Sequence, residues 1–430
     1  MQTRACLTLL AALAPALPLL AQSSSPSYAR VDSAVVDELR RTSTPGAAVA
    51  LVVGDSVVYA KGFGSTAADG AAVTPATTFR IASITKVFTA ATLVSLAEAG
   101  RVDLAAPIGA RLGELPDSLR RITAHQLLSH TAGLIMMPAP ATGADPATAL
   151  ADAAARVPAR AAFTAPGEIF SYSNLGYQLA GRLIEVAGER PYAEQVRRTL
   201  LMPLGLTATS FDSTVGLGAL PFAGLSSNVL DLSRFAIAFM NAGRPDGSRA
   251  LTSPMVARLT APAARFQSGP GDYGYGLRLY RHRGVDVVEH GGVDPAGYRS
   301  LLYMVPSRRV AVIVLANRAG RRPYAIADAA LDALIPGAVT PVVAPAAVVP
   351  MDSAEMTRYT GRYAGGLVVE VSVDNGVLTL HQGAQALSIR KLASGELVAG
   401  GEEGQFIAFV PGSDGAVKYL HFNMRAFRRM

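Results

Sequence analysis

The chain has 430 residues, of which 50% are hydrophobic and 17% charged, a composition typical of globular rather than disordered proteins. Its net charge of +7 comes from scattered arginines without a basic block, so we interpret it as a solubility feature and expect no nucleic-acid partner. The one cysteine, Cys6, lies so close to the start that a processed chain would have no disulfide, cysteine nucleophile or thiolate metal site.

The first 23 residues have the features of a secretory signal peptide. Arg4 provides a positive start, residues 7–20 are apolar, and small residues close the segment at 21–23. The apolar run is short for a membrane span, and a Ser/Pro-rich stretch follows it. We therefore expect cleavage, a periplasmic or secreted protein, and no stable membrane insertion. An uncleaved membrane anchor is the alternative.

Both helical and extended patterns follow in the next 80 residues. The apolar spacing over 29–41 predicts a helix, and the β-rich runs 47–53 and 56–63 meet at the hairpin signal Gly54-Asp55. A long helix is expected from about residue 83 to 99.

Strands return late in the chain. Residues 103–285 consist mostly of helical segments and loops, and they precede three strands and a helix, expected at 285–289, 299–304, 310–316 and 324–334. This order predicts an α+β domain over 29–335, with one mixed, mainly antiparallel sheet formed from both ends and a helical lobe beside it. A cleft between sheet and lobe is the expected place for a site.

A second, smaller domain is expected at the C-terminal end. Residues 336–350 are a proline-rich spacer, and 351–430 carry short strand patterns separated by the turn signals Asn375-Gly376 and Asp414-Gly415. We predict a small antiparallel β-barrel or sandwich that serves as a lid or packing module. Its strands are expected at 367–373, 377–382, 387–391, 396–398, 406–410 and 417–422.

The helix expected at Ser83 carries the first chemical signal. It is apolar on nearly every face and should be buried, yet Lys86, one of only four lysines, lies in its first turn. Burial disfavours the ammonium form, and Ser83 shares a helical face with Lys86 at a spacing of three. These features predict a hydroxyl nucleophile beside an amine base, at a helix N-terminus that favours negative charge. Alternatively, Ser83 only caps the helix and Lys86 reaches solvent.

Two further segments have the residue types of a substrate site. In Tyr172-Ser173-Asn174, the phenol can relay a proton and Asn174 can bind a substrate amide, although a simple N-cap would look similar. In His290-Gly291-Gly292, which ends a strand, the glycines let a ligand approach backbone N–H groups. A plain β-turn is the alternative there.

The motifs S-x-x-K, Y-x-N and H-x-G in this order resemble the penicillin-recognising serine hydrolases. The resemblance is to the group around class C β-lactamases, D-stereospecific carboxypeptidases and aminopeptidases, and β-lactamase-like esterases. It covers roughly Val31 to Leu334 and implies a β-lactamase/transpeptidase-like fold. The stretches that carry it are FRIASITKVFTA, ITAHQLLSHTAGL, FSYSNLGYQLAGRLIEV, YGYGLRL and EHGGVDPAGYRS.

The resemblance also implies a role for each residue. Ser83 would be acylated, with its proton managed by Lys86 and Tyr172 as the other catalytic residues. The substrate would contact Asn174, His290, Gly291, Gly292 and Val293, with the backbone N–H groups of Ser83 and Val293 holding the oxyanion. This chain departs from the S-D-N and K-T-G pattern of class A enzymes. Because His290 stands where many relatives have lysine, potent β-lactamase activity is not expected.

Other candidates are less favoured. Ser129 and His130 are adjacent, and adjacent helical residues do not face each other, so we assign them a structural role, as we do Glu168. The remaining histidines lack metal-ligand spacing, and no G-x-S-x-G or Walker A motif is present, so we expect neither a metal nor a cofactor.

The sequence therefore predicts an exported serine hydrolase acting on a small ester, amide or peptide through an acyl-Ser83 intermediate. An esterase or a D-amino-acid or peptide hydrolase is favoured. A class C-like β-lactamase and a catalytically inactive envelope binding protein are the alternatives.

Overall fold

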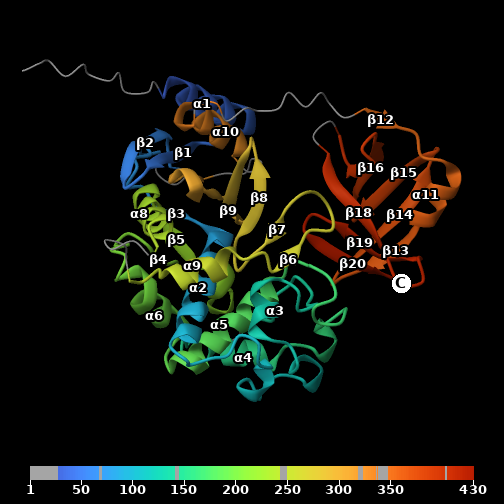
Figure 1. Cartoon of the computed structure of the whole chain (residues 1–430), viewed down its shortest axis with the longest axis horizontal. Helices are drawn as coiled ribbons and strands as arrows, with labels where there is room; N and C mark the ends of the chain where they lie inside the picture. The colour runs from blue at the N-terminus through green and yellow to red at the C-terminus, as the bar shows by residue number, and fades with distance from the viewer. Residues whose placement is uncertain are drawn as a thin grey trace, which may run out of the picture.

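The computed structural model describes residues 28–66, 70–140, 145–242, 249–317, 323–335, 337, 347–401 and 404–430. The signal peptide expected at 1–23 lies outside these ranges, and so does most of the linker expected at 336–350. Within them, no helix has the length and apolar character needed to span a membrane. Figure 1 shows a larger lobe of helices and sheet beside a C-terminal barrel.

One sheet organises the larger lobe, in the order β2-β1-β11-β10-β9-β8-β7-β6. The pairing of β1 with β11 joins the two ends of the domain, as predicted. Every pairing in this sheet is antiparallel over the described residues, a stricter arrangement than the mixed sheet expected. The strands are β1 (Gly46–Val53), β2 (Ser56–Gly64), β6 (Ala264–Arg265), β7 (Asp272–Tyr273), β8 (Arg278–His282), β9 (Val285–Val293), β10 (Arg299–Val305) and β11 (Val310–Ala316).

Strand β1 shows how the sheet separates two cores. Its side chains alternate between the faces, so Ala48 and Ala50 enter one apolar cluster while Val49 and Leu51 enter another. The second cluster lies under α1 (Ala29–Thr42) and α10 (Tyr324–Leu334). The first contacts the helical lobe, which contains α2 (Thr85–Glu98), α3 (Ala124–Leu128), α4 (Ala149–Ala155), α5 (Asn174–Gly188), α6 (Tyr192–Val196), α7 (Leu220–Ala223), α8 (Val229–Met240) and α9 (Ser253–Thr260).

The C-terminal domain is a closed barrel. Its strands follow chain order from β13 to β20, β13 pairs with β20, and the additional pairing of β16 with β17 accompanies this meander. The strands are β13 (Gly361–Ala364), β14 (Val368–Asp374), β15 (Val377–Gln382), β16 (Gln385–Leu392), β17 (Leu397–Ala399), β18 (Gln405–Pro411), β19 (Val417–Phe422) and β20 (Arg425–Arg429). Of the two forms expected, barrel and sandwich, the barrel is therefore the one that forms.

Several elements near the barrel were not expected. Strands β13 and β20 and helix α11 (Ser353–Tyr359) have no counterpart in the sequence prediction. Two residues of the expected linker, Val348 and Val349, form β12 and pair with β16. The division of the chain at 336–350 otherwise stays a prediction.

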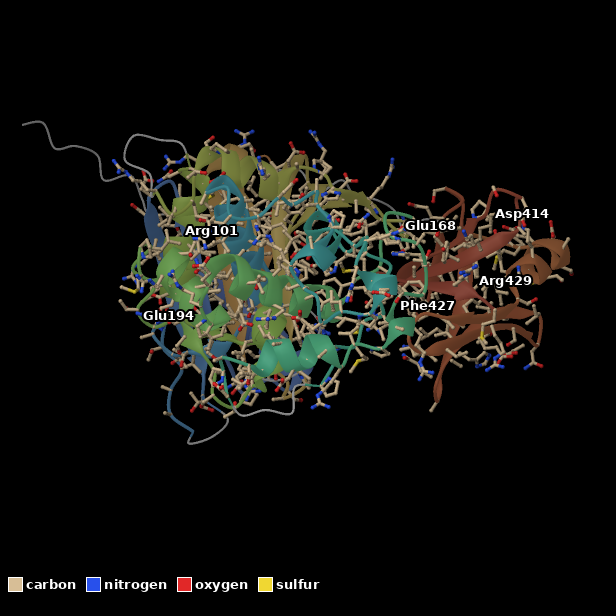
Figure 2. The ribbon with its side chains drawn as sticks, turned by 90° about the horizontal axis from the view of Figure 1, so that it is seen from below. Arg101, Glu168, Glu194, Asp414, Phe427 and Arg429 are labelled. Carbon is tan, nitrogen blue, oxygen red and sulfur yellow. The ribbon has the colours of Figure 1, made fainter. Side chains whose placement is uncertain are left out.

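The barrel contacts the larger lobe through a defined set of bonds. Lys418 on β19 forms an ion pair with Glu168, and Tyr419 and Thr164 share a hydrogen bond between their hydroxyls. Figure 2 shows Glu168 at the boundary between the two parts. The Ala426 N–H of β20 donates to Ser171 Oγ at 3.2 Å. This contact fixes the barrel beside the segment that contains Tyr172.

Candidate active site

Ser83 lies in a short turn rather than in the long helix itself. A 3₁₀ turn, Ala82–Ile84, precedes α2. The regular helix therefore begins at Thr85, whereas the sequence predicted a start at about residue 83. Ala82 has φ of 45°, a left-handed value that is uncommon for a residue other than glycine and that often marks functional sites. Both neighbours of Ser83 are buried while Ser83 itself is partly exposed. The turn therefore presents the hydroxyl at the surface of a rigid element.

Lys86 lies directly behind this hydroxyl. Its side chain is fully buried, and its Nζ is 3.1 Å from Ser83 Oγ and 3.1 Å from the Phe222 carbonyl oxygen. The Tyr172 ring centroid is 4.8 Å from Nζ. Among the described residues no carboxylate pairs with Lys86. Burial therefore lowers the pKa of this amine well below its ordinary value of 10.5, which favours the neutral, proton-accepting form.

The segment 172–174 contains both a helix N-cap and the side chains that the sequence suggested for chemistry. Ser173 is the N-cap of α5, since its Oγ accepts from the Gly176 N–H at 3.1 Å. The two flanking residues do not cap the helix and are the candidates for a catalytic or binding role. Tyr172 is half-buried beside Lys86, and Asn174 is the first residue of α5. The Asn174 Oδ1 atom is buried and has no hydrogen-bond partner in the described part of the chain. An amide in that state suits a ligand N–H group.

The His130 ring packs against the Tyr172 ring. The two ring centroids are 4.3 Å apart, and His130 Nδ1 accepts from the Ser173 N–H at 3.1 Å. Burial lowers the pKa of His130 well below its usual value, so the imidazole is neutral. Ser129 does not pair with it, because Ser129 Oγ donates to the His125 carbonyl oxygen at 2.7 Å. His130 therefore has a structural role, as expected, and its ring is the surface against which Tyr172 packs. Nothing in the sequence indicated this contact.

His290 lies within β9. It is 3% exposed, and its Nδ1 is 2.8 Å from the Gly291 carbonyl oxygen. Because a carbonyl only accepts, Nδ1 donates, and Nε2 can accept from the Tyr273 hydroxyl at 3.1 Å. The centroids of the Tyr172 and His290 rings are 6.3 Å apart, so both candidate segments line the same site.

Gly292 brings the end of β9 against the Ser83 turn. A Cβ atom at this position would be 2.1 Å from Ser300 Oγ and 2.4 Å from the Ile81 carbonyl oxygen, so only glycine fits. Ser300 Oγ also donates to that Ile81 oxygen at 2.8 Å. Gly291 pairs with Leu301 on β10, and Val293, half exposed, is the last residue of β9. The two expected oxyanion residues, Ser83 and Val293, therefore belong to packed neighbouring segments.

Glu168 is not part of this site. Burial raises its pKa, but hydrogen bonds from Lys418 and Thr164 outweigh that effect and lower the pKa to about 2. The carboxylate is thus held ionised in the contact with the barrel, as its structural assignment predicted. No group of three or more His, Cys, Asp or Glu side chains with the arrangement of a metal site occurs among the residues that the structure describes.

The fold and this arrangement define a hydrolase-type domain with a β-lactamase/transpeptidase-like fold. Residues 31–336 match the sequence model of the beta-lactamase family, and the chain belongs to that family. The match extends over the sheet, the helical lobe and every residue of the candidate site.

Relatives and solved structures agree with this assignment. Protein flp of Staphylococcus aureus (strain COL) is 25% identical over 324 residues, which are 68% of this chain but only 63% of flp. A D-aminopeptidase of Gluconobacter oxydans (strain 621H) is 28% identical over 315 residues, 67% of this chain and 59% of that protein. The crystal structure of SurE with D-Leu has a TM-score of 0.74 at 24% identity and covers 94% of this chain and 100% of its own. Its likeness, at that identity, concerns the fold, including the barrel.

Proposed function

We propose that this protein is an exported serine hydrolase that cleaves an ester or amide through an acyl-Ser83 intermediate. The observation that carries the proposal is the 3.1 Å approach of a fully buried Lys86 Nζ to a partly exposed Ser83 Oγ. Burial of an amine without a carboxylate partner lowers stability, so a residue of this kind is expected to have a function. The pairing of a hydroxyl with a nearby base is the recurrent feature of activated serine nucleophiles.

The first half of the reaction forms the acyl-enzyme. Ser83 Oγ attacks the substrate carbonyl carbon while its proton passes to the neutral Lys86 amine. The developing oxyanion accepts hydrogen bonds from the backbone N–H groups of Ser83 and Val293, and Asn174 orients the substrate. Collapse of the tetrahedral intermediate breaks the bond to the leaving atom, which takes a proton through Tyr172. Ser83 then carries the acyl group as an ester.

The second half reverses this sequence with water. A water molecule loses a proton to the Lys86–Tyr172 pair and attacks the acyl-Ser83 carbonyl. The Ser83 oxygen leaves and regains its proton, so the net reaction adds one water across the ester or amide bond. His290 and Gly292 form the opposite wall of the substrate site.

The substrate is proposed to be a short ester or a D-amino-acid or small peptide derivative. Support comes from the D-aminopeptidase among the relatives and from the D-Leu in the SurE structure. A histidine at position 290 lacks the permanent charge of a lysine, which disfavours a potent β-lactamase. Export to the periplasm or medium is proposed from the signal-peptide pattern at 1–23.

The test compares the chain without residues 1–23 with its Ser83→Ala variant, on 4-nitrophenyl acetate and on a chromogenic cephalosporin. We expect ester turnover that Ser83→Ala abolishes and little cephalosporin turnover. Ser129→Ala is the matched control, because Ser129 also has a histidine neighbour but is fully buried and bonded to backbone, and it should retain activity. Efficient cephalosporin turnover would assign a β-lactamase. Ester turnover that survives Ser83→Ala would refute the proposal, and no turnover of either substrate would favour the binding protein.

A further inference from the structure

The hairpin between β19 and β20 reaches from the barrel into the candidate active site. Its two turn residues, Asn423 and Met424, have φ of 50° and 62°, the left-handed values of a tight two-residue turn. The Met424 carbonyl oxygen accepts from the Tyr172 N–H at 2.8 Å. Methionine at positive φ is unfavourable, and such strain persists where the surroundings hold it in place. The turn is therefore fixed to the backbone of the Tyr172 segment.

Arg425 comes directly after this turn. It lies between two points of attachment, because the Ala426 N–H on its other side donates to Ser171 Oγ. The guanidinium is partly buried, and none of the described residues accepts a hydrogen bond from it or forms an ion pair with it. Arg429, at the other end of the same strand, instead donates to the Thr360 and Arg358 carbonyl oxygens. A partly buried arginine without an acceptor has five N–H donors available for a ligand.

Arg425 differs from Lys86 and His290 in how firmly it keeps a positive charge. Burial lowers its pKa, and an interaction with Tyr172 partly offsets that effect. An arginine nevertheless remains protonated at neutral pH. Lys86, in contrast, is driven toward its neutral form by burial, and both ring nitrogens of His290 lie within hydrogen-bond distance of protein oxygens. Arg425 is thus the cation beside Tyr172 that keeps its charge.

We propose that Arg425 binds a carboxylate on the leaving group of the substrate, so that the barrel contributes a specificity residue to the active site. This inference rests on the proposed acyl-Ser83 reaction, in which Tyr172 passes a proton to the leaving atom. A planar guanidinium binds a carboxylate through two parallel hydrogen bonds. The preferred substrates would then be esters or amides whose departing alcohol or amine carries a carboxylate, such as the C-terminal residue of a peptide.

The test uses two esters that differ only in that carboxylate: 4-nitrophenyl acetate and 3-carboxy-4-nitrophenyl acetate. The measured quantity is the ratio of kcat/KM for the carboxylated ester to that for the neutral ester. Arg425→Gln should lower this ratio about 10- to 100-fold, the range expected for losing charge-assisted hydrogen bonds. Arg425→Lys, which keeps the charge but loses the planar fork, should give an intermediate ratio.

Arg428→Gln is the matched control, since Arg428 is an exposed arginine on the same strand and its loss changes the net charge equally. Its ratio should equal that of the wild type. An Arg425→Gln ratio equal to the wild type, or equal losses on both esters, would overturn the carboxylate assignment. Ser83→Ala separates the two proposals: it should abolish both reactions, and turnover that survives it would refute the acyl-Ser83 mechanism itself.

Discussion

The central residue pair is Ser83 and Lys86. Its activity depends on whether burial keeps the Lys86 amine neutral. The Lys86 amine is buried without a carboxylate partner in the described residues, so its pKa is lowered well below 10.5. A base must be unprotonated to act. Activity should therefore rise with pH through this lowered pKa and reach a plateau well below pH 10.5.

Substitution of Lys86 separates charge from basicity. Lys86→Arg retains a cation that cannot release its proton, so we expect kcat to fall about 10²- to 10⁴-fold. Lys86→Met removes the base and also the cost of burying an ionisable group, so it should be inactive and at least as stable as the wild type. Ester kinetics and thermal unfolding measure the two effects. Wild-type activity in Lys86→Arg would show that Lys86 is not the base.

Much of the site at this scale could be predicted from sequence. A lysine in an otherwise apolar helix, three residues after a serine, indicates the pair because helical spacing alone brings the two side chains together. His130 could not be recognised in the same way. Its contact with Tyr172 depends on how two separate segments pack, and a histidine without spacing or partners in sequence gives no indication of such packing.

At the scale of elements, the contact between β9 and the Ser83 turn determines the geometry of the site. Gly292→Ala would place a methyl group 2.1 Å from Ser300 Oγ and 2.4 Å from the Ile81 carbonyl oxygen. We expect a loss of about 1–3 kcal/mol in unfolding free energy from overpacking. A displacement of the nucleophile by about 1 Å can lower activity about 10²-fold.

Gly113→Ala provides the control for this substitution. Nothing lies within 4 Å of a Cβ at Gly113, and it is an exposed position in a loop. It should keep both its melting temperature and its ester turnover. If the two alanine variants behaved alike, the contact at Gly292 would not be what positions Ser83.

Strand β20 shows why part of the barrel could not be predicted from the sequence. Strand β20 has three arginines in five residues and no alternation of apolar and polar side chains, and its turn is Asn-Met rather than a Gly-containing pair. Pairing with β13 and β19 stabilises it in the barrel. The strand that carries Arg425 was thus missed because its conformation is determined by tertiary contacts. In the large sheet, β1, β2, β9, β10 and β11 coincide with the apolar runs from which strands were predicted, whereas β6, β7 and β8 lie in the region where helices and loops were expected.

At the scale of the whole molecule, the position of the barrel depends in part on an ion pair. The pKa of Glu168 in the folded protein is about 2, below its ordinary value of 4.5, because Lys418 and Thr164 stabilise the carboxylate. This contribution to stability is fully present above pH 4.5 and is lost as the pH falls toward 2. The contact of β19 with the larger lobe should weaken over that interval.

Glu168→Gln tests this contact. At pH 7 we expect a small decrease in the melting temperature, which shrinks as the pH is lowered from 4.5 toward 2. Glu194→Gln is the control, because Glu194 also forms an ion pair, with Arg198, but lies on α6, far from the barrel (Figure 2). Its substitution should leave the contact between β19 and the larger lobe unchanged. A pH-independent difference between Glu168→Gln and the wild type would contradict the assignment.

The most direct test of the account is to identify the residue that becomes acylated. The protein would be mixed with a slowly hydrolysed activated ester, quenched during turnover, digested and analysed by mass spectrometry. We predict one acyl group per chain on the peptide that contains Ser83, absent from Ser83→Ala and decaying as product forms. An acyl group on any other residue, or turnover without a covalent adduct at any quench time, would contradict the acyl-Ser83 mechanism.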